Sequence, residues 1–208
     1  MSDITLPLSL KVVVGMSGAG KSHLCYRYLY SAPGVACRFI FDDLDRASTH
    51  YRVRPCQTAD ECEAALETRW VVYRPHKMYP DDFAEAFRFF CDWTLDACKR
   101  GPGKKLILLE EIWQWCNPHQ IPKDLSRLIN IGRPEGAEVI INTMLPHKLH
   151  SSITGACTEA IFFRTDERLA FDAIQGLGGN PDEIQKLPLR NFVALNRLSR
   201  SVLRGKAP

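Results

Sequence analysis

Residues 11–30 read KVVVGMSGAGKSHLCYRYLY and give the strongest indication of the fold. This stretch opens with a short apolar run, continues into a glycine-rich turn and ends in a segment of helical character. Along the rest of the chain, strand-length apolar runs alternate with longer segments of helical period. Such alternation favours parallel strands joined by helical crossovers. We therefore expect an α/β fold with a mainly parallel central sheet flanked by helices.

The same pattern gives boundaries for the elements. Strands are expected at Lys11 to Val14, Cys37 to Phe41, Trp70 to Tyr73, Leu106 to Leu109, Val139 to Thr143, Ala160 to Phe163 and Phe192 to Asn196. Helices are expected at Lys21 to Tyr30, Ala59 to Glu67, Asp81 to Lys99 and Lys123 to Ile131. Thr58 is a candidate N-cap, and Gly132 is expected to end the last of these helices. An aromatic stripe in the third helix, Phe83, Phe87 and Phe90 among it, should pack in the core.

The turn after the first strand matches the pattern G-x-x-x-x-G-K-[ST] at every fixed position. About one chain in a hundred of this length would match by chance, and the flanking strand and helix make chance less probable still. Glycines let the backbone wrap with its N–H groups inward, and the helix N-terminus adds the positive end of its dipole. The alternative is a turn that merely joins strand to helix. The residues expected to bind phosphates are Gly15, Met16, Ser17, Gly18, Ala19, Gly20, Lys21, Ser22 and His23.

The apolar run at residues 106–109 ends in two adjacent carboxylates, Glu110 and Glu111. Unpaired charges at the edge of a core cost roughly several kcal/mol each, so such a pair usually faces something positive. We interpret that partner as Mg²⁺ on a nucleotide, reached because a neighbouring parallel strand ends at the same edge of the sheet. The alternative is that the two acids begin a solvated turn. Asp42 and Asp43, after the second strand, either lie at this edge too or cap a solvated strand end.

The two motifs assign a chemical role to each side chain. Lys21 is expected to reach the β and γ phosphates and Ser22 to bind Mg²⁺. Glu110 would hold the ion through a water molecule. Glu111 would orient and polarise the water that attacks the γ-phosphate.

Composition fits one soluble globular domain. The 208 residues include 45% hydrophobic and 25% charged residues, so we expect a single domain over 1–208, with the basic segment 184–208 as part of it. No window approaches the roughly 18 uninterrupted apolar residues of a membrane span, and the first residues lack the pattern of a secretion signal. The eight cysteines have no zinc-site spacing, which favours buried, reduced thiols in a cytosol.

Charge gives a weaker indication of partners. The formal net charge of +3 is too small to indicate a nucleic-acid partner. Segment 184–208 contains six basic residues and no acid. It is either a solvated face or a contact for DNA, a membrane or a capsid.

Seven stretches of the chain resemble one known superfamily. They are GMSGAGKS, RFIFDD, RWVVYRP, LILLEE, NIGRPEGAEVIINTMLP, AIFFRTDE and KLPLRNFVALNR. Their order and spacing are similar to those of the HerA/FtsK superfamily, and within it to the genome-packaging ATPases of tailless icosahedral viruses, especially those with an internal membrane. The resemblance implies a three-layer P-loop NTPase fold of the RecA/FtsK-like (ASCE) type, with ATP and Mg²⁺ as cofactors.

The resemblance also implies a ring, with a hexamer expected, in which an arginine of one subunit reaches the nucleotide of the next. Arg133 matches that arginine best, and Arg127 is the reserve. Either could instead be a surface ion-pair partner. Such a finger contributes about 10³ to 10⁵ in rate in related phosphate chemistry.

Two positions depart from the superfamily pattern. The metal-binding acid is usually Asp, and here it is Glu110, one methylene longer. The strand after Arg133 usually ends in a glutamine that senses the γ-phosphate, and here Met144 stands at that place. Asn142 and Thr143 are the candidates to replace it.

The function that the resemblance implies is an ATP-hydrolysing DNA translocase that packages a viral genome into a preformed capsid. Its partners would be viral DNA and capsid-vertex or portal proteins, and its location the host cytoplasm or the packaging vertex of the virion. The alternatives are a cellular HerA-like translocase, an assembly ATPase like those of filamentous phages, and a small-molecule kinase. The strandedness of the DNA and the size of the ring stay open.

Overall fold

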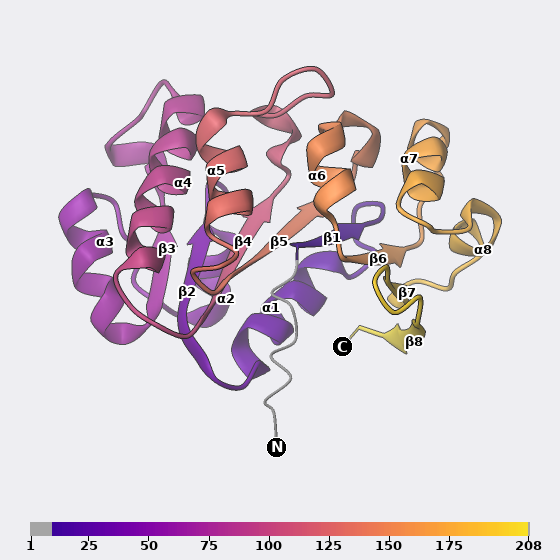
Figure 1. Ribbon diagram of the computed structural model, residues 1–208, viewed down its shortest axis with the longest axis horizontal. Coiled ribbons are helices and arrows are strands. Elements are labelled where there is room, and N and C mark those ends of the chain that lie inside the picture. Colours follow the sequence, from indigo (N-terminus) through magenta and orange to yellow (C-terminus); the bar gives the residue numbers. More distant parts are fainter. Residues whose placement is uncertain (1–9, 208) are drawn as a thin grey trace.

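The computed structural model describes residues 10–207, which form one eight-stranded sheet between two layers of helices (Figure 1). The strands are β1 (Leu10–Val14), β2 (Val35–Phe41), β3 (Trp70–Tyr73), β4 (Lys104–Glu110), β5 (Ala137–Thr143), β6 (Glu159–Phe163), β7 (Asn191–Asn196) and β8 (Val202–Lys206). The α-helices are α1 (Lys21–Ser31), α2 (Arg46–Tyr51), α3 (Ala59–Ala65), α4 (Phe83–Lys99), α5 (Lys123–Ile131), α6 (Ser151–Ala156), α7 (Phe171–Gly176) and α8 (Pro181–Gln185). The 3₁₀ helices are η1 (Leu66–Thr68), η2 (Pro75–Lys77), η3 (Ile112–Gln114), η4 (Pro146–Lys148) and η5 (Arg168–Ala170).

The expected α/β fold with a mainly parallel sheet is confirmed, and all seven predicted strands and four predicted helices are present. Thr58 caps α3 by accepting a hydrogen bond from the Glu61 N–H, and Gly132 follows the end of α5. Helix α4 begins two residues later than predicted because the Asp82 side chain caps it. Strand β8 and helices α2, α6, α7 and α8 were not predicted.

The order of strands across the sheet is β3-β2-β4-β5-β1-β6-β7-β8, with antiparallel pairing confined to β6–β7 and β7–β8. Strand β5 therefore separates β1 from β4, so the expectation that the strand of the acid pair neighbours the first strand is wrong. The parallel strands still end together, since Val14 pairs with Thr143 and Glu110 with Asn142. We call this side of the sheet the carboxyl edge, and the side where β1, β4 and β5 begin the amino edge.

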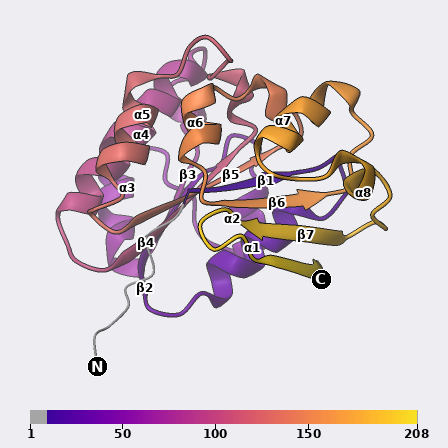
Figure 2. The same cartoon turned by 45° about the vertical axis from the view of Figure 1, so that its right-hand side comes forward.

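Each face of the sheet has its own apolar core. Helices α3 to α8 contribute to the core on one face, and α1 and α2 to the core on the other (Figure 2). The aromatic stripe of α4 packs in the core at Phe87 and Phe90, whose rings are centred 5.4 and 5.5 Å from that of Phe41. Phe83, at the start of the helix, is only half-buried, and its ring centre lies 5.1 Å from that of His76. All eight cysteines are buried free thiols, as predicted. No helix within residues 10–207 has the length and apolar character needed to cross a bilayer.

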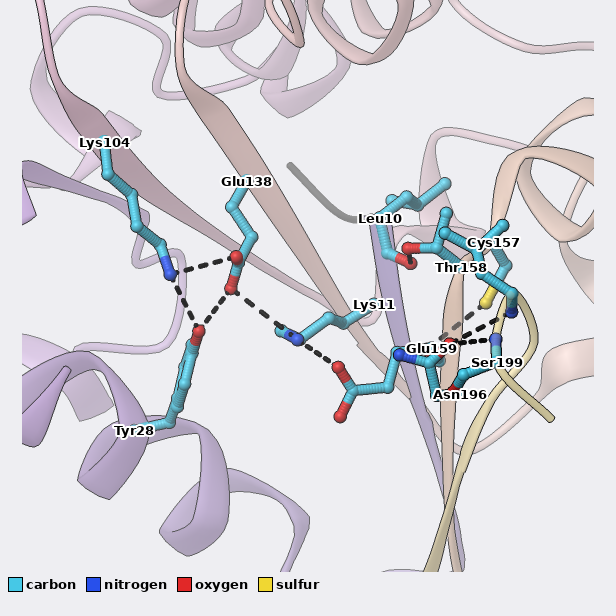
Figure 3. Close-up of polar contacts among 11 residues, drawn as sticks. Leu10, Lys11, Tyr28, Lys104, Glu138, Cys157, Thr158, Glu159, Asn196 and Ser199 are labelled. Atoms are coloured by element: carbon cyan, nitrogen blue, oxygen red, sulfur yellow. Dashed lines mark hydrogen bonds and ion pairs between the residues drawn. The ribbon is translucent and has the colours of Figure 1, made fainter. Parts of the chain in front are cut away.

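A cluster of charged side chains joins the strands at the amino edge (Figure 3). Glu138 on β5 is 4% exposed and accepts a hydrogen bond from the Tyr28 hydroxyl at 2.6 Å. Its carboxylate also pairs with Lys104 on β4 at 3.1 Å and with Lys11 on β1 at 3.9 Å. Lys11 pairs in addition with Glu159 on β6. This amino-edge cluster thus links four consecutive strands of the sheet to α1.

The basic C-terminal segment adds an antiparallel hairpin, β7–β8, to the sheet next to β6 (Figure 1). Arg197, at the hairpin turn, donates hydrogen bonds to the carbonyl oxygens of Thr154 at 2.5 Å and Cys157 at 2.9 Å. After β8, the Ala207 N–H donates to the Arg190 carbonyl oxygen at 2.7 Å. The hairpin consequently brings the end of the described chain back against the turn that follows β1.

Candidate phosphate and metal site

The turn between β1 and α1, residues 15–22, lies at the carboxyl edge, and we call it the phosphate loop. Gly18 and Gly20 have φ angles of 74° and 110°, in the left-handed region that glycine adopts without a steric penalty. Ser17 and Gly18 are exposed at its tip, whereas Ala19 is 1% exposed. The loop is anchored to β6 by a hydrogen bond from the Met16 N–H to the Arg164 carbonyl oxygen at 2.9 Å.

Helix α1 starts with its N–H groups uncapped by side chains. Its N-cap is Gly20, which has no side chain to accept a hydrogen bond, and the first turn contains no acid. The N-terminus of an 11-residue helix with these features suits an anion. His23 is exposed in the first turn, where its ring centre lies 6.3 Å from that of His50.

Lys21 lies folded against the phosphate loop. Its ammonium donates a hydrogen bond to the Met16 carbonyl oxygen at 3.1 Å, and the residue is 7% exposed. Burial lowers the pKa of Lys21, while the nearby charges of Glu111 and Glu110 act to raise it. The loop lysine and the acid pair therefore occupy the same small region.

Ser22 and Glu110 are in direct contact although they come from different elements. The Ser22 Oγ donates a hydrogen bond to Glu110 Oε1 at 2.7 Å, and Tyr26 donates to Glu110 Oε2 at 2.8 Å. The Asn142 Nδ2 donates to Glu110 Oε1 at 2.5 Å and to Ser22 Oγ at 3.1 Å. Helix α1 and the strands β5 and β4 thus bring a hydroxyl, an amide and a carboxylate to one point.

These side chains fit Mg²⁺. Hydroxyl and carboxylate oxygens are the hard ligands that Mg²⁺ prefers, and it usually takes one or two carboxylates with phosphates and water completing its shell. The Asn142 Oδ1 is buried and has no hydrogen-bond partner among the described residues, so it is available to a further polar ligand. No group of three or more His, Cys, Asp or Glu with metal-site geometry occurs within residues 10–207.

Glu111 adopts a left-handed backbone conformation, with φ of 49°, directly after β4. Its Oε2 accepts hydrogen bonds from Trp113 Nε1 at 2.8 Å, the Met144 N–H at 3.0 Å and Thr143 Oγ1 at 3.4 Å. The residue is therefore held by the end of β5 and by its own following turn. Trp113 was not predicted as a partner of Glu111, because a tryptophan two residues after an acid is no signal by itself.

The three positions considered for a γ-phosphate sensor have different surroundings. Asn142 contacts Ser22 and Glu110, as described above. Thr143 contacts Glu111 through its hydroxyl, while Met144 offers Glu111 its backbone N–H. Asn142 is thus nearest to the residues expected to bind the metal, and its role as a sensor stays a prediction.

Asp42 and Asp43 differ from each other. Asp42 is 3% exposed and accepts three backbone hydrogen bonds from the first turn of α2, from the N–H groups of Arg46, Ala47 and Ser48. It is a structural cap. Asp43 is partly buried, and burial raises its pKa to about 6, with the charges of Asp42 and Glu110 adding to the shift.

The two candidate arginines lie away from the phosphate loop of their own chain. Arg127 on α5 forms ion pairs with Asp92 at 2.6 Å and Asp124 at 3.8 Å. Arg133 precedes β5 and lines a small cavity with Leu10, at the amino edge. The length of β5 separates Arg133 from the site, so within one chain it is not part of it.

Comparison with known proteins gives similarity in structure alone. No family model matches the sequence, and no curated protein matches it. The genome packaging NTPase B204 from Sulfolobus turreted icosahedral virus 2, in complex with ATP-gammaS, superposes with a TM-score of 0.78 at 18% identity, covering 98% of this chain and 99% of that chain.

Two further structural neighbours are proteins of other kinds, a secretion ATPase and a plasmid coupling protein. The cytoplasmic domain of the Thermomonospora curvata type VII secretion ATPase EccC has a TM-score of 0.59 at 13% identity, covering 95% of this chain and 25% of that chain. The plasmid coupling protein TrwB has a TM-score of 0.58 at 10% identity, covering 96% and 85%. The predicted P-loop ATPase fold is thereby confirmed.

Proposed function

We propose that this protein hydrolyses ATP and uses the energy to move DNA during genome packaging. The observation that carries the proposal is the 2.7 Å contact between Ser22 of the phosphate loop and Glu110 of β4. It joins the two nucleotide motifs into one site, with Lys21 and Glu111 beside them. The fold shared with a genome packaging NTPase supports the same conclusion.

Each residue of the site has a defined task in this proposal. N–H groups of the phosphate loop and of the start of α1 would bind the phosphates, apart from that of Met16, which donates to Arg164. The Lys21 ammonium would reach the β and γ phosphates. Ser22 and Glu110 would hold Mg²⁺, which when bound neutralises charge on the phosphate oxygens. Glu111 positions the attacking water. All its side-chain hydrogen bonds among the described residues go to Oε2, which leaves Oε1 for that water.

The DNA-handling part of the proposal rests on the neighbours and on the sequence resemblance. B204 is a genome packaging NTPase and TrwB a plasmid coupling protein. For this chain we infer a ring, with a hexamer expected, in which Arg133 acts on the next subunit. The ring would package a viral genome into a preformed capsid, in the host cytoplasm or at the packaging vertex, next to capsid-vertex or portal proteins.

Phosphate release from ATP, measured with and without DNA, tests the proposal. We expect DNA to raise the rate, and Lys21→Ala and Glu111→Gln to lower it by about 10² or more, as for loss of a charged phosphate contact or a general base. Lys77→Ala and Glu67→Gln are matched controls, because both residues are exposed and form no ion pair among the described residues. Both should retain the rate of the unaltered protein.

Three outcomes would contradict the proposal in different ways. Undiminished hydrolysis by Lys21→Ala would exclude the phosphate loop as the site. Hydrolysis that DNA does not change would exclude the DNA motor, and stimulation by a protein substrate instead would favour an activity like that of EccC. Transfer of the γ-phosphate to a small metabolite would favour a kinase.

A further inference from the structure

Glu110 is held at both of its carboxylate oxygens. Oε1 accepts hydrogen bonds from Ser22 Oγ at 2.7 Å and Asn142 Nδ2 at 2.5 Å. Oε2 accepts from the Tyr26 hydroxyl at 2.8 Å, the one hydrogen bond that any described residue makes to this atom. Ser22 and Asn142 lie at the phosphate loop and at the end of β5, whereas Tyr26 approaches from farther along α1. The two oxygens are therefore fixed from two directions.

Tyr26 is itself fixed by its surroundings. The residue is 5% exposed, and its ring centre lies 4.9 Å from that of His50 and 5.5 Å from that of Tyr51. The Tyr51 hydroxyl donates a hydrogen bond to the Tyr26 carbonyl oxygen at 2.6 Å.

The helix places Ser22 and Tyr26 on the same carboxylate. They are four residues apart in α1, the spacing that puts two side chains on one face. Glutamate has one more rotatable bond than aspartate, so Glu110 loses more conformational freedom when its carboxylate is held in one orientation. The hydrogen bond from Tyr26 to Oε2 restricts the Glu110 side chain before any ligand binds.

We propose that Tyr26 is a positioning residue for the metal site. Its hydroxyl holds Oε2 of Glu110, which keeps Oε1 directed at Ser22, the pair that would hold Mg²⁺. The inference rests on the proposed function and deepens it. The hydroxyl thereby restrains a side chain that has one more rotatable bond than aspartate.

The variant Tyr26→Phe tests this role because it removes the hydroxyl and keeps the ring. Binding of a fluorescent ATP analogue is titrated at increasing Mg²⁺ and again in EDTA, without reference to hydrolysis. We expect unchanged affinity in EDTA. The Mg²⁺ concentration needed for half-maximal tightening should rise about tenfold or more, as for loss of a hydrogen bond to a charged group.

Tyr28→Phe is the matched control. It also removes a tyrosine hydroxyl from α1. This hydroxyl likewise donates to a carboxylate, that of Glu138, at 2.6 Å (Figure 3). Glu138 lies at the amino edge, so the Mg²⁺ dependence should equal that of the unaltered protein. Thermal unfolding of each variant shows that the comparison is between folded proteins.

Glu110→Asp gives an independent test. It withdraws the carboxylate from Tyr26 by one methylene, so adding Tyr26→Phe in this background should shift the Mg²⁺ dependence no further. An equal shift in both backgrounds would overturn the inference, as would Tyr26→Phe with unaltered Mg²⁺ dependence or Tyr28→Phe with the same loss. Nucleotide binding that Mg²⁺ does not affect in the unaltered protein would instead reject the proposed function itself.

Discussion

At the scale of the residue, Gly20 shows how closely the phosphate loop is packed. A Cβ at this position would lie 3.2 Å from both the Ala207 Cβ and a ring carbon of Phe163, and the φ of 110° is unfavourable for any other residue. We expect Gly20→Ala to lower the free energy of unfolding by about 1–2 kcal/mol. It should also weaken nucleotide binding, because the loop N–H groups would move.

Urea unfolding and nucleotide titration measure the two effects of Gly20→Ala. Gly155→Ala is the control, since Gly155 lies in α6 with no atom within 4 Å of an added Cβ. That change should be neutral or stabilise by about 0.5–1 kcal/mol, as for glycine replaced in a helix. Equal behaviour of the two variants would contradict the packing argument.

Site residues that belong to a motif of fixed spacing can be predicted from the sequence. Residues that come into contact only when the chain folds cannot. The phosphate loop and the acid pair were predicted because backbone N–H groups and adjacent carboxylates must occur in order along the chain. Tyr26 and Glu110 are 84 residues apart, and nothing in either local sequence pairs them. The contact of Trp113 with Glu111 was missed although the two residues are neighbours, because a tryptophan two residues after an acid is no recognisable signal.

At the scale of the element, the amino-edge cluster supports the sheet where no nucleotide motif lies. Glu138→Gln would leave Lys104 and Lys11 without their shared carboxylate at a 4% exposed position. We expect a loss of about 3 kcal/mol in the free energy of unfolding, at the lower end of the range for breaking a buried pair. Urea unfolding at neutral pH measures it.

Glu63→Gln is the comparison for that prediction. Glu63 pairs with Arg100, and both side chains are about half exposed, so the loss should stay within about 1 kcal/mol. A loss at Glu138 no larger than that at Glu63 would show that the amino-edge cluster does not stabilise the sheet.

The predicted elements are those with a long or buried pattern. The seven predicted strands contain apolar runs. Strand β8 contains none, and as an edge strand it leaves Val202 and Leu203 51% and 64% exposed. Helices α2, α6, α7 and α8 have five or six residues each, too few to establish a helical period. The expectation that the strand of the acid pair neighbours the first strand was wrong because periodicity along a chain does not specify which strands pair.

For the whole molecule, Arg133 matters through assembly. Because it lies at the amino edge of its own chain, a role for it in hydrolysis requires contact with another subunit. If this arginine serves the site of the next subunit, Arg133→Ala should lower ATP hydrolysis by about 10³ or more. Mixing it with Glu111→Gln subunits should restore activity, since intact sites then face intact arginines. Phosphate release across a range of mixing ratios measures the recovery.

Arg127→Ala is the control for assembly, because Arg127 is already paired with Asp92 and Asp124. It should keep most of the activity by itself. If the mixture of Arg133→Ala and Glu111→Gln stays as inactive as its components, Arg133 does not act between subunits.

The packing of Ala207 against Gly20 has a practical consequence for handling the protein. Ala207 is 2% exposed, and its N–H is bonded to Arg190, so the last described residues are built into the wall of the phosphate loop. A bulky group attached at Ala207 would therefore lie beside the loop. Labels intended to leave nucleotide binding intact belong on exposed side chains of α3 or α4, on the opposite face of the sheet.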